Sequence, residues 1–159
     1  MAKARAIEGL AEAESFRVAA AAAVEVRADE VFEHLHRALD TTDIEGVHDM
    51  RVATRRLRAA MEIFAACFPK QPHRTALREV KALADALGAR RDPDVAIAAL
   101  ENVVAGLTDE DAPGVEHMIA DLRAEQQAAN ETLAQALAEI ETTDLRSRLV
   151  GLVEEARRP

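Results

Sequence analysis

Apolar residues recur every three to four positions through most of this 159-residue chain, which is the spacing of one face of an α-helix. The pattern predicts a first helix from about Ser15 to Leu39 and a second from about Glu45 to Phe68, which Pro69 ends. The alternation that marks a half-buried β-strand does not occur in the sequence. The sequence therefore predicts an all-α protein, an antiparallel helical bundle of about six helices with short connections.

Four more helices complete the predicted bundle, at about 74–87, 93–106, 115–140 and 145–156. Gly88 is expected to end the third helix as a left-handed cap, because glycine tolerates the positive φ of that position. Asp92 and Pro93 resemble the N-cap and the first residue of the fourth helix. We expect a single domain over residues 1–159, divided into one part over 15–106 and a second part, the long helix and the C-terminal helix, over 113–157.

Charge is distributed unevenly along the chain. The net charge is −9, which argues against a general nucleic-acid binder. Between His48 and Arg91, however, ten Lys and Arg residues stand against only four Asp and Glu residues. Aromatic residues make up 3% of the chain, too few for the base stacking on which single-strand binders depend. The basic region indicates either an anionic ligand or a solvated helix face that pairs with the acidic helices.

The apolar segments and the single cysteine of the chain predict its cellular location. The alanine run at 19–23 is too short to span a bilayer, and acidic residues interrupt any secretory apolar segment near the N-terminus. The single cysteine, Cys67, excludes an internal disulfide, and its apolar neighbours predict a buried thiol. We expect a soluble, cytoplasmic protein that does not contact membranes.

The basic residues of the second predicted helix share one face. At about 100° per residue, Arg51, Arg55 and Arg58 fall within roughly 80° of His48, and we expect no acidic side chain on this stripe. The opposite side carries the apolar residues Met50, Leu57, Met61, Phe64 and Phe68. Arginine keeps its charge and offers a planar fork of donors that matches phosphate oxygens, while His48 becomes a cation as the pH falls. A row of such groups suits a ligand with regularly repeated negative charge.

The third predicted helix repeats the arrangement with Arg74, Arg78 and Lys81 at four-then-three spacing. If the second and third helices pack in opposite directions, the two basic rows would line one groove. Arg90 and Arg91 would then close the end of that groove.

Two segments of the chain resemble the CHAD family, the conserved histidine α-helical domain. Residues 47–59, VHDMRVATRRLRA, are similar to its signature of a histidine followed by R-V-x-x-R-R-L-R. Residues 87–95, LGARRDPDV, match its second motif, L-G followed shortly by R-D-x-D-V. The resemblance implies helical bundles with a basic surface that bind inorganic polyphosphate, in proteins associated with polyphosphate granules. The residues that match the family's basic positions are His48, Arg51, Arg55, Arg56, Arg58, Lys81 and Arg91.

The chain departs from the family pattern in one respect. Complete family domains usually hold two pseudo-symmetric helical halves, each with its own basic motif, whereas no second motif follows Gly106 here. The chain therefore looks like one half of a typical two-bundle domain plus two extra helices. The predicted helix 115–140 carries a coiled-coil-like seam, and we expect this seam to pair two chains as a homodimer. The seam consists of Val115, Ile119, Leu122, Gln126, Ala129, Leu133, Ala136 and Ile140.

Three other functions are less well supported by the sequence. For a metal site, His34 and His36 would point about 160° apart on a helix, and no His-x-x-x-His or cysteine pair occurs. For an enzyme acting on phosphoanhydrides, Glu12 and Glu14 lack the lysine of the Glu-x-Glu-x-Lys motif of the tunnel domain that often accompanies this family. A protein adaptor that docks an acidic helix remains a further alternative. We expect no catalytic residues, no metal and no cofactor.

Overall fold

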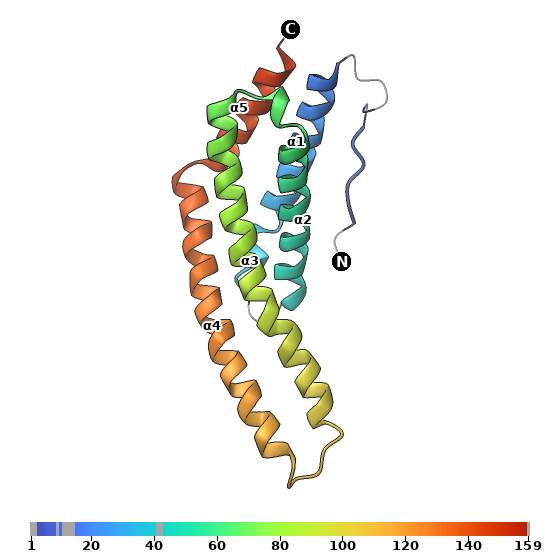
Figure 1. The fold of residues 1–159 in the computed structure, drawn as a ribbon, viewed down its shortest axis with the longest axis vertical. Coiled ribbons are helices and arrows are strands. Elements are labelled where there is room, and N and C mark those ends of the chain that lie inside the picture. Colours follow the sequence, from blue (N-terminus) through green and yellow to red (C-terminus); the bar gives the residue numbers. More distant parts are fainter. Residues whose placement is uncertain (1–2, 9, 11–14, 41–42, 159) are drawn as a thin grey trace.

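The computed structural model describes residues 3–8, 10, 15–40 and 43–158, and this part of the chain is helical without a strand (Figure 1). The predicted all-α class is confirmed. Its five α-helices are α1 (Phe16–Glu33), α2 (Ile44–Ile63), α3 (Lys70–Val104), α4 (Ala112–Thr142) and α5 (Leu145–Arg157). Two 3₁₀ turns, Leu35–Arg37 and Ala65–Cys67, follow α1 and α2, so both helices end earlier than the apolar pattern predicts.

The third and fourth predicted helices form one continuous helix, α3, which is why the described residues hold five α-helices rather than about six. Gly88 is an ordinary helical residue and not a left-handed cap, and Asp92 lies exposed in mid-helix and not at an N-cap. Pro93 is also inside the helix, where its missing N–H and its ring account for the bend that α3 shows along its length (Figure 1). Continuous burial of one side of α3 from Leu87 to Ile97 carries the helix through these local stop signals.

The predicted seam of α4 is occupied within the chain. α4 makes its most extensive contacts with α3, which runs alongside it in the opposite direction (Figure 1). Ile119, Leu133 and Ile140 of the seam are buried in this contact or against the main core. The apolar residues of the seam thus pack inside one chain, and a homodimer through helix 115–140 stays a prediction.

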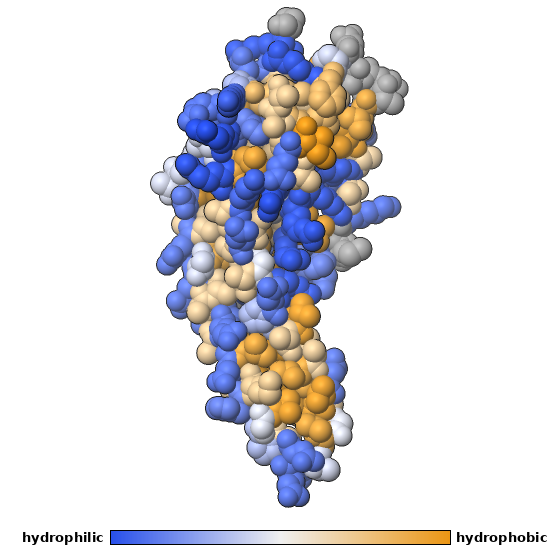
Figure 2. Space-filling model, in the orientation of Figure 1, coloured by the Kyte–Doolittle hydropathy of each residue, from blue (hydrophilic) through white to orange (hydrophobic). Residues whose placement is uncertain are grey.

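The main core lies between α1, α2, α5, the first half of α3 and the end of α4, and it is built mainly from aliphatic side chains and methionine. α1 packs on both α2 and α5, and the Arg157 guanidinium joins the far ends of the chain by donating to Glu25 Oε1 at 3.1 Å. The C-terminal part of α3 and the N-terminal part of α4 extend beyond this core as a two-helix arm. Figure 2 shows apolar surface on this arm. Within the described ranges, none of the helices has the length and apolar character needed to cross a membrane.

The start of α2 is fixed by a small polar cluster. Asp43 is the N-cap: its Oδ1 accepts from the Gly46 backbone N–H at 3.0 Å, and its Oδ2 accepts from Arg37 Nε at 2.9 Å. The hydrogen bond from Arg37 is the main reason that the pKa of Asp43 is lowered. A Cβ added at Gly46 would stand 2.6 Å from the Arg37 carbonyl oxygen, so this position has room only for glycine. These contacts set where the helix that carries the first motif begins.

Candidate functional site

The two sides of α2 differ as the sequence predicts. Met50, Leu57 and Met61 are buried in the core. Arg55, on the opposite side, is exposed, while His48, Arg51 and Arg58 are partly exposed at its edges. The 3.6-residue period of the helix therefore separates hydrocarbon from cationic groups, and the cations do not point into the bundle interior.

Most of the cations on this side of α2 have no partner of their own. Among the residues that the structure describes, His48, Arg51 and Arg55 make no hydrogen bond or ion pair through their side chains. Arg56, by contrast, is half-buried and engaged within the chain. Unpaired guanidinium groups one turn apart repel each other by a few tenths of a kcal/mol per pair, so a bound anion would relieve a cost already present in the fold.

One carboxylate does lie on the stripe, contrary to the sequence prediction. Glu62 Oε1 is 3.2 Å from Arg58 Nε and 2.9 Å from Lys81 Nζ, so a single negative charge is shared by two cations. The hydrogen bond from Lys81, followed by that from Arg58, lowers the pKa of Glu62 below its usual value. The stripe is thus partly neutralised at this end, and the same contact brings Lys81 of α3 beside the cations of α2.

Two contacts set the register between α2 and α3, which run in opposite directions (Figure 1). Glu62 meets Lys81 near the end of α2, and Ile44 lines a hollow with Asp94, Ile97 and Ala98 at its start. The intermediate positions then fall level with each other, Arg51 with Arg91 and Arg55 with Gly88. We call the resulting surface the α2–α3 basic face, which consists of His48, Arg51, Arg55, Arg58, Lys81 and Arg91.

Two predicted site residues lie on the surface but outside this face. Arg74 is exposed in the first turns of α3, beyond the last turn of α2, and donates to Gln71 Oε1 at 3.1 Å. Arg78 lines a separate hollow of about 230 Å³ between α3 and α4, where Glu79 and Glu139 are also found. The expectation that the basic row of α3 joins that of α2 therefore holds for Lys81 alone among these three residues.

Arg90 does not close a groove, because it is fully buried between α3 and α4. Its Nη1 pairs with Asp94 Oδ1, and its Nε donates to Asn130 Oδ1 at 3.1 Å. Gln126 Nε2 also donates to Asp94 Oδ1, at 2.6 Å, so the pair is held by two amides of α4. Two sequence features signal this network: Arg90 and Asp94 are four residues apart on one helix, and Gln126 is the one strongly polar member of the seam.

The buried pair also touches the α2–α3 basic face. Asp94 Oδ2 accepts no hydrogen bond from the described residues and lies 3.9 Å from Arg91 Nη1. The Arg91 side chain is 17% exposed, so it is held at the edge of the interior with part of its guanidinium facing outward. Sequence reasoning assigned Asp92 to a cap and missed that Asp94, two residues later, positions Arg91.

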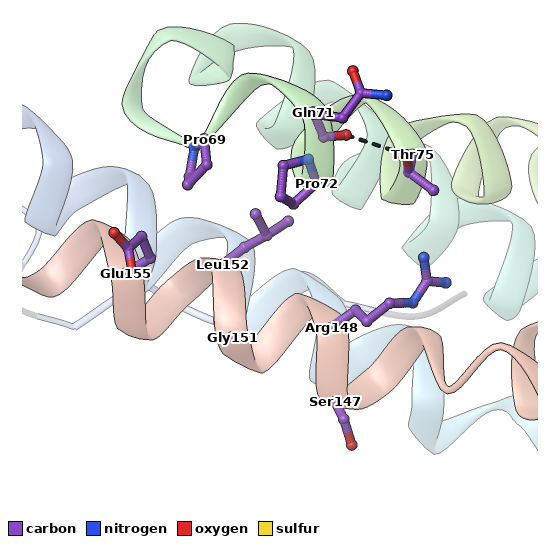
Figure 3. Close-up of a pocket in the computed structure, with 9 residues that line it drawn as sticks. All are labelled: Pro69, Gln71, Pro72, Thr75, Ser147, Arg148, Gly151, Leu152 and Glu155. Atoms are coloured by element: carbon purple, nitrogen blue, oxygen red, sulfur yellow. Dashed lines mark hydrogen bonds between the residues drawn. The ribbon is translucent and has the colours of Figure 1, made fainter.

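Three further features of the described residues bear on catalysis and metal binding. A hollow of about 730 Å³ lies between α5 and the start of α3, where Pro69, Pro72 and Leu152 form apolar walls (Figure 3). Cys67 is buried, as predicted, and burial raises the pKa of its thiol. In the described ranges no three His, Cys, Asp or Glu side chains are grouped to hold a metal ion. Glu12 and Glu14 lie outside the described residues.

The fold and the site define a class: an all-helical protein with a row of basic side chains along one helix, only part of which is neutralised by Glu62. A family model for the CHAD domain matches residues 22–159. The chain therefore belongs to the CHAD domain family. No curated protein matches the sequence.

Proposed function

We propose that this protein binds inorganic polyphosphate, or a similar linear polyanion, on the α2–α3 basic face without chemical conversion of the ligand. The observation that carries the proposal is the row of basic side chains, His48, Arg51 and Arg55, which have no partner among the described residues and lie on the side of α2 that faces away from the core. From His48 to Arg58 the row is about 15 Å long, so it can meet several successive phosphates of one chain. The family resemblance points to the same ligand.

The charge of the rest of the molecule favours a thin ligand over a wide one. The chain carries a net charge of −9, although the basic face itself is positive. A duplex nucleic acid would bring phosphates close to the acidic surroundings, whereas a single phosphate chain lying along α2 would stay near the guanidinium groups. Binding is expected to release counterions and to weaken steeply as salt is added. We also propose a cytoplasmic location, in association with polyphosphate granules.

A protein adaptor is the second candidate, and the arm favours it. Val95 and Val103 of α3 and Met118 of α4 are about half exposed there. Exposed apolar side chains that lie close together suit contact with another protein. Val103 and Met118 lie farther along the arm than Arg91, the last cation of the α2–α3 basic face, so substitutions there should leave the other function intact. Val103→Ser with Met118→Ser should leave polyphosphate binding unchanged.

The test is a calorimetric titration of long-chain polyphosphate at two salt concentrations. Arg51→Ala with Arg55→Ala is expected to weaken binding at least tenfold and to reduce its salt dependence, while the melting temperature changes little because neither side chain has a partner to lose. The control, Arg123→Ala with Arg158→Ala, makes the same change in net charge on other surfaces and should bind nearly as the unsubstituted protein does. Equal losses in both double variants would refute the proposed site.

A further inference from the structure

One side of the two-helix arm carries an apolar strip that the described residues leave uncovered (Figure 2). Val103 of α3 is 49% exposed on it and Met118 of α4 is 53% exposed. The apolar strip consists of Ala96, Leu100 and Val103 of α3 and of Met118 and Leu122 of α4. Apolar surface shared by two neighbouring helices is the kind of surface on which a third helix docks.

Helical spacing places the residues of the apolar strip on the same side of the arm. Ala82 of α3 and Ala136 of α4 line one hollow between the two helices. Leu100 comes eighteen residues after Ala82, and Met118 comes eighteen residues before Ala136, which is about five complete turns in both cases. Leu100 and Met118 therefore lie on the same side of the α3–α4 contact as this hollow, and they face the same partner.

The charged side chains beside the apolar strip are acidic. Asp92 of α3 and Asp121 and Glu125 of α4 flank it and are exposed. Among the described residues, the side chains of Asp92 and Glu125 form no ion pair, and Asp121 has only the exposed His117 at 3.8 Å. Over residues 95–125, seven Asp and Glu residues stand against one Arg. The strip is thus apolar along its middle and negative along both edges.

These charges decide what the apolar strip can bind. A polyanion would be repelled by the carboxylates, and Arg78 on this side lies about five turns before Ala96, too far away to offset them. A second copy of the chain is also poorly suited, because two arms placed strip to strip would bring the acidic edges of both copies together. The cationic side of α2 has no large exposed apolar side chain between His48 and Arg58 to cover the strip.

We propose that the apolar strip binds an amphipathic helix of another protein, with Lys or Arg residues on both flanks of its apolar side. This inference names the partner of the second candidate function, the protein adaptor, and rests on that function. Apolar residues of the partner at helical spacing contact Leu100, Val103 and Met118 across α3 and α4. Its cations meet the carboxylates on both edges of the strip, which sets the position of the partner helix and disfavours acidic helices.

The apolar strip and the α2–α3 basic face lie on different sides of α3. Arg91, the last cation of that face, precedes Ala96 by five residues, which is about 140° around the helix. Val103 is farther along the arm by about two more turns. A partner on the strip therefore leaves the α2–α3 basic face open to an anion.

The test uses two synthetic peptides of about 18 residues with the same row of leucines on one side of a helix. One peptide has lysine at all other positions, and the second has glutamate there. Binding of each fluorescein-labelled peptide to the full chain is measured by fluorescence anisotropy in the absence of polyphosphate. The lysine peptide is expected to bind, and the glutamate peptide is expected to bind more weakly by a factor on the order of ten.

Val103→Ser with Met118→Ser tests the apolar part of the strip. The double variant is expected to bind the lysine peptide about tenfold more weakly, because the partner loses its central apolar contacts. The matched control is Ile63→Ser with Val150→Ser, which removes apolar side chains that are 70% and 50% exposed on other surfaces. The control should bind as the unsubstituted protein does. Thermal unfolding should give similar melting temperatures for both variants, since each side chain is about half exposed or more.

Asp121→Asn with Glu125→Gln tests the acidic edge. This variant is expected to bind the lysine peptide about fivefold more weakly at low salt, and the difference should shrink as salt screens the charges. The control is Glu101→Gln with Glu116→Gln, which makes the same change in net charge in a hollow on the other side of the α3–α4 contact. Its affinity should change by less than about twofold.

Equal losses in a test variant and its control would overturn the site, because the peptide would then be held only by the overall negative charge. If light scattering shows a dimer that Val103→Ser with Met118→Ser converts to a monomer, a second copy occupies the strip and the inference is wrong. Binding of the glutamate peptide that depends on Val103 and Met118 would leave the adaptor function standing but refute a basic partner. If neither peptide binds the strip, the adaptor function fails with the inference, whereas polyphosphate binding is measured separately and stands or falls on its own.

Discussion

Replacing Glu62 by glutamine removes a carboxylate that pairs with two cations of the α2–α3 basic face. Glu62 accepts from both Arg58 and Lys81, at 3.2 and 2.9 Å, and these contacts keep it ionised by lowering its pKa. The glutamine side chain has nearly the same shape but no charge. The substitution therefore raises the local charge by one unit without opening space in the fold, and we expect it to strengthen polyphosphate binding.

The size of the effect follows from distance and screening. A phosphate held by Arg58 or Lys81 would lie roughly 7 Å from the Glu62 carboxylate, where the repulsion is about 2.4 kcal/mol at an effective dielectric constant of ~20. Salt at about 0.15 M, with a Debye length of ~8 Å, reduces this to about 1 kcal/mol. That free energy corresponds to about fivefold tighter binding. The lost ion pairs are exposed, so the free energy of unfolding should fall by no more than about 1 kcal/mol.

The assay is calorimetric titration with polyphosphate at pH 7 and at several salt concentrations. Glu101→Gln serves as the control, because Glu101 also pairs with an arginine, Arg123, at 2.9 Å, but lies on the arm. Both variants gain one unit of net charge, so a difference between them isolates the position of the charge. The gain for Glu62→Gln should shrink as salt increases, because screening acts on the repulsion that has been removed.

If Glu62→Gln binds no more tightly than Glu101→Gln, then Arg58 and Lys81 do not contact the ligand. The basic face would then be limited to the α2 cations nearer its N-terminus. Weaker binding by Glu62→Gln would show instead that the carboxylate holds the two cations in a productive position, which contradicts a purely electrostatic role.

Three further predictions concern stability. Asp94→Ala is expected to lower the free energy of unfolding by about 3–5 kcal/mol, because it leaves the buried Arg90 guanidinium without its charge partner; a loss below ~1 kcal/mol in urea denaturation would contradict this. Gly46→Ala should cost about 1–3 kcal/mol in thermal unfolding, since its Cβ would stand 2.6 Å from the Arg37 carbonyl oxygen. Because its pKa is lowered by Arg37, the Asp43 carboxyl stabilises the fold above its unfolded pKa near 3.8 and loses this effect as pH falls through the lower folded value. Asp43→Asn should therefore flatten the acid side of a plot of melting temperature against pH, and an unchanged acid side would refute this assignment.

The periodicity of α2 was sufficient to predict both its buried and its cationic side. In a long amphipathic helix the apolar side packs on the core, so the polar side must face outward. α3 was harder to predict. Gly88 and Pro93 are local signals for the end of a helix, and the sequence alone does not show that packing against α4 outweighs them. The seam of α4 was found correctly, but a seam pattern does not say whether its partner is a second chain or a helix of the same chain.

The cations on α2 were found from the sequence, whereas their partners were not. Arg90 looks like a surface arginine until the fold shows that Asp94 and two amides of α4 surround it. Glu62 was within reach of the sequence, because it follows Arg58 by four residues and helical spacing places it on the same side. Its contact with Lys81 depends on the register between α2 and α3, which the spacing of either helix alone does not specify.

The pairing of α1 with α5 has a consequence for how the protein folds. Glu25 and Arg157, which form an ion pair, are separated by 132 residues, and Arg17 Nη2 donates to the Glu155 carbonyl oxygen at 3.0 Å. During synthesis, the alanine-rich flank of α1 leaves the ribosome long before the segment that covers it. Until α5 has been translated, that flank of α1 is exposed to water or bound by a chaperone. Closure of the core is therefore a late step that joins distant parts of the chain.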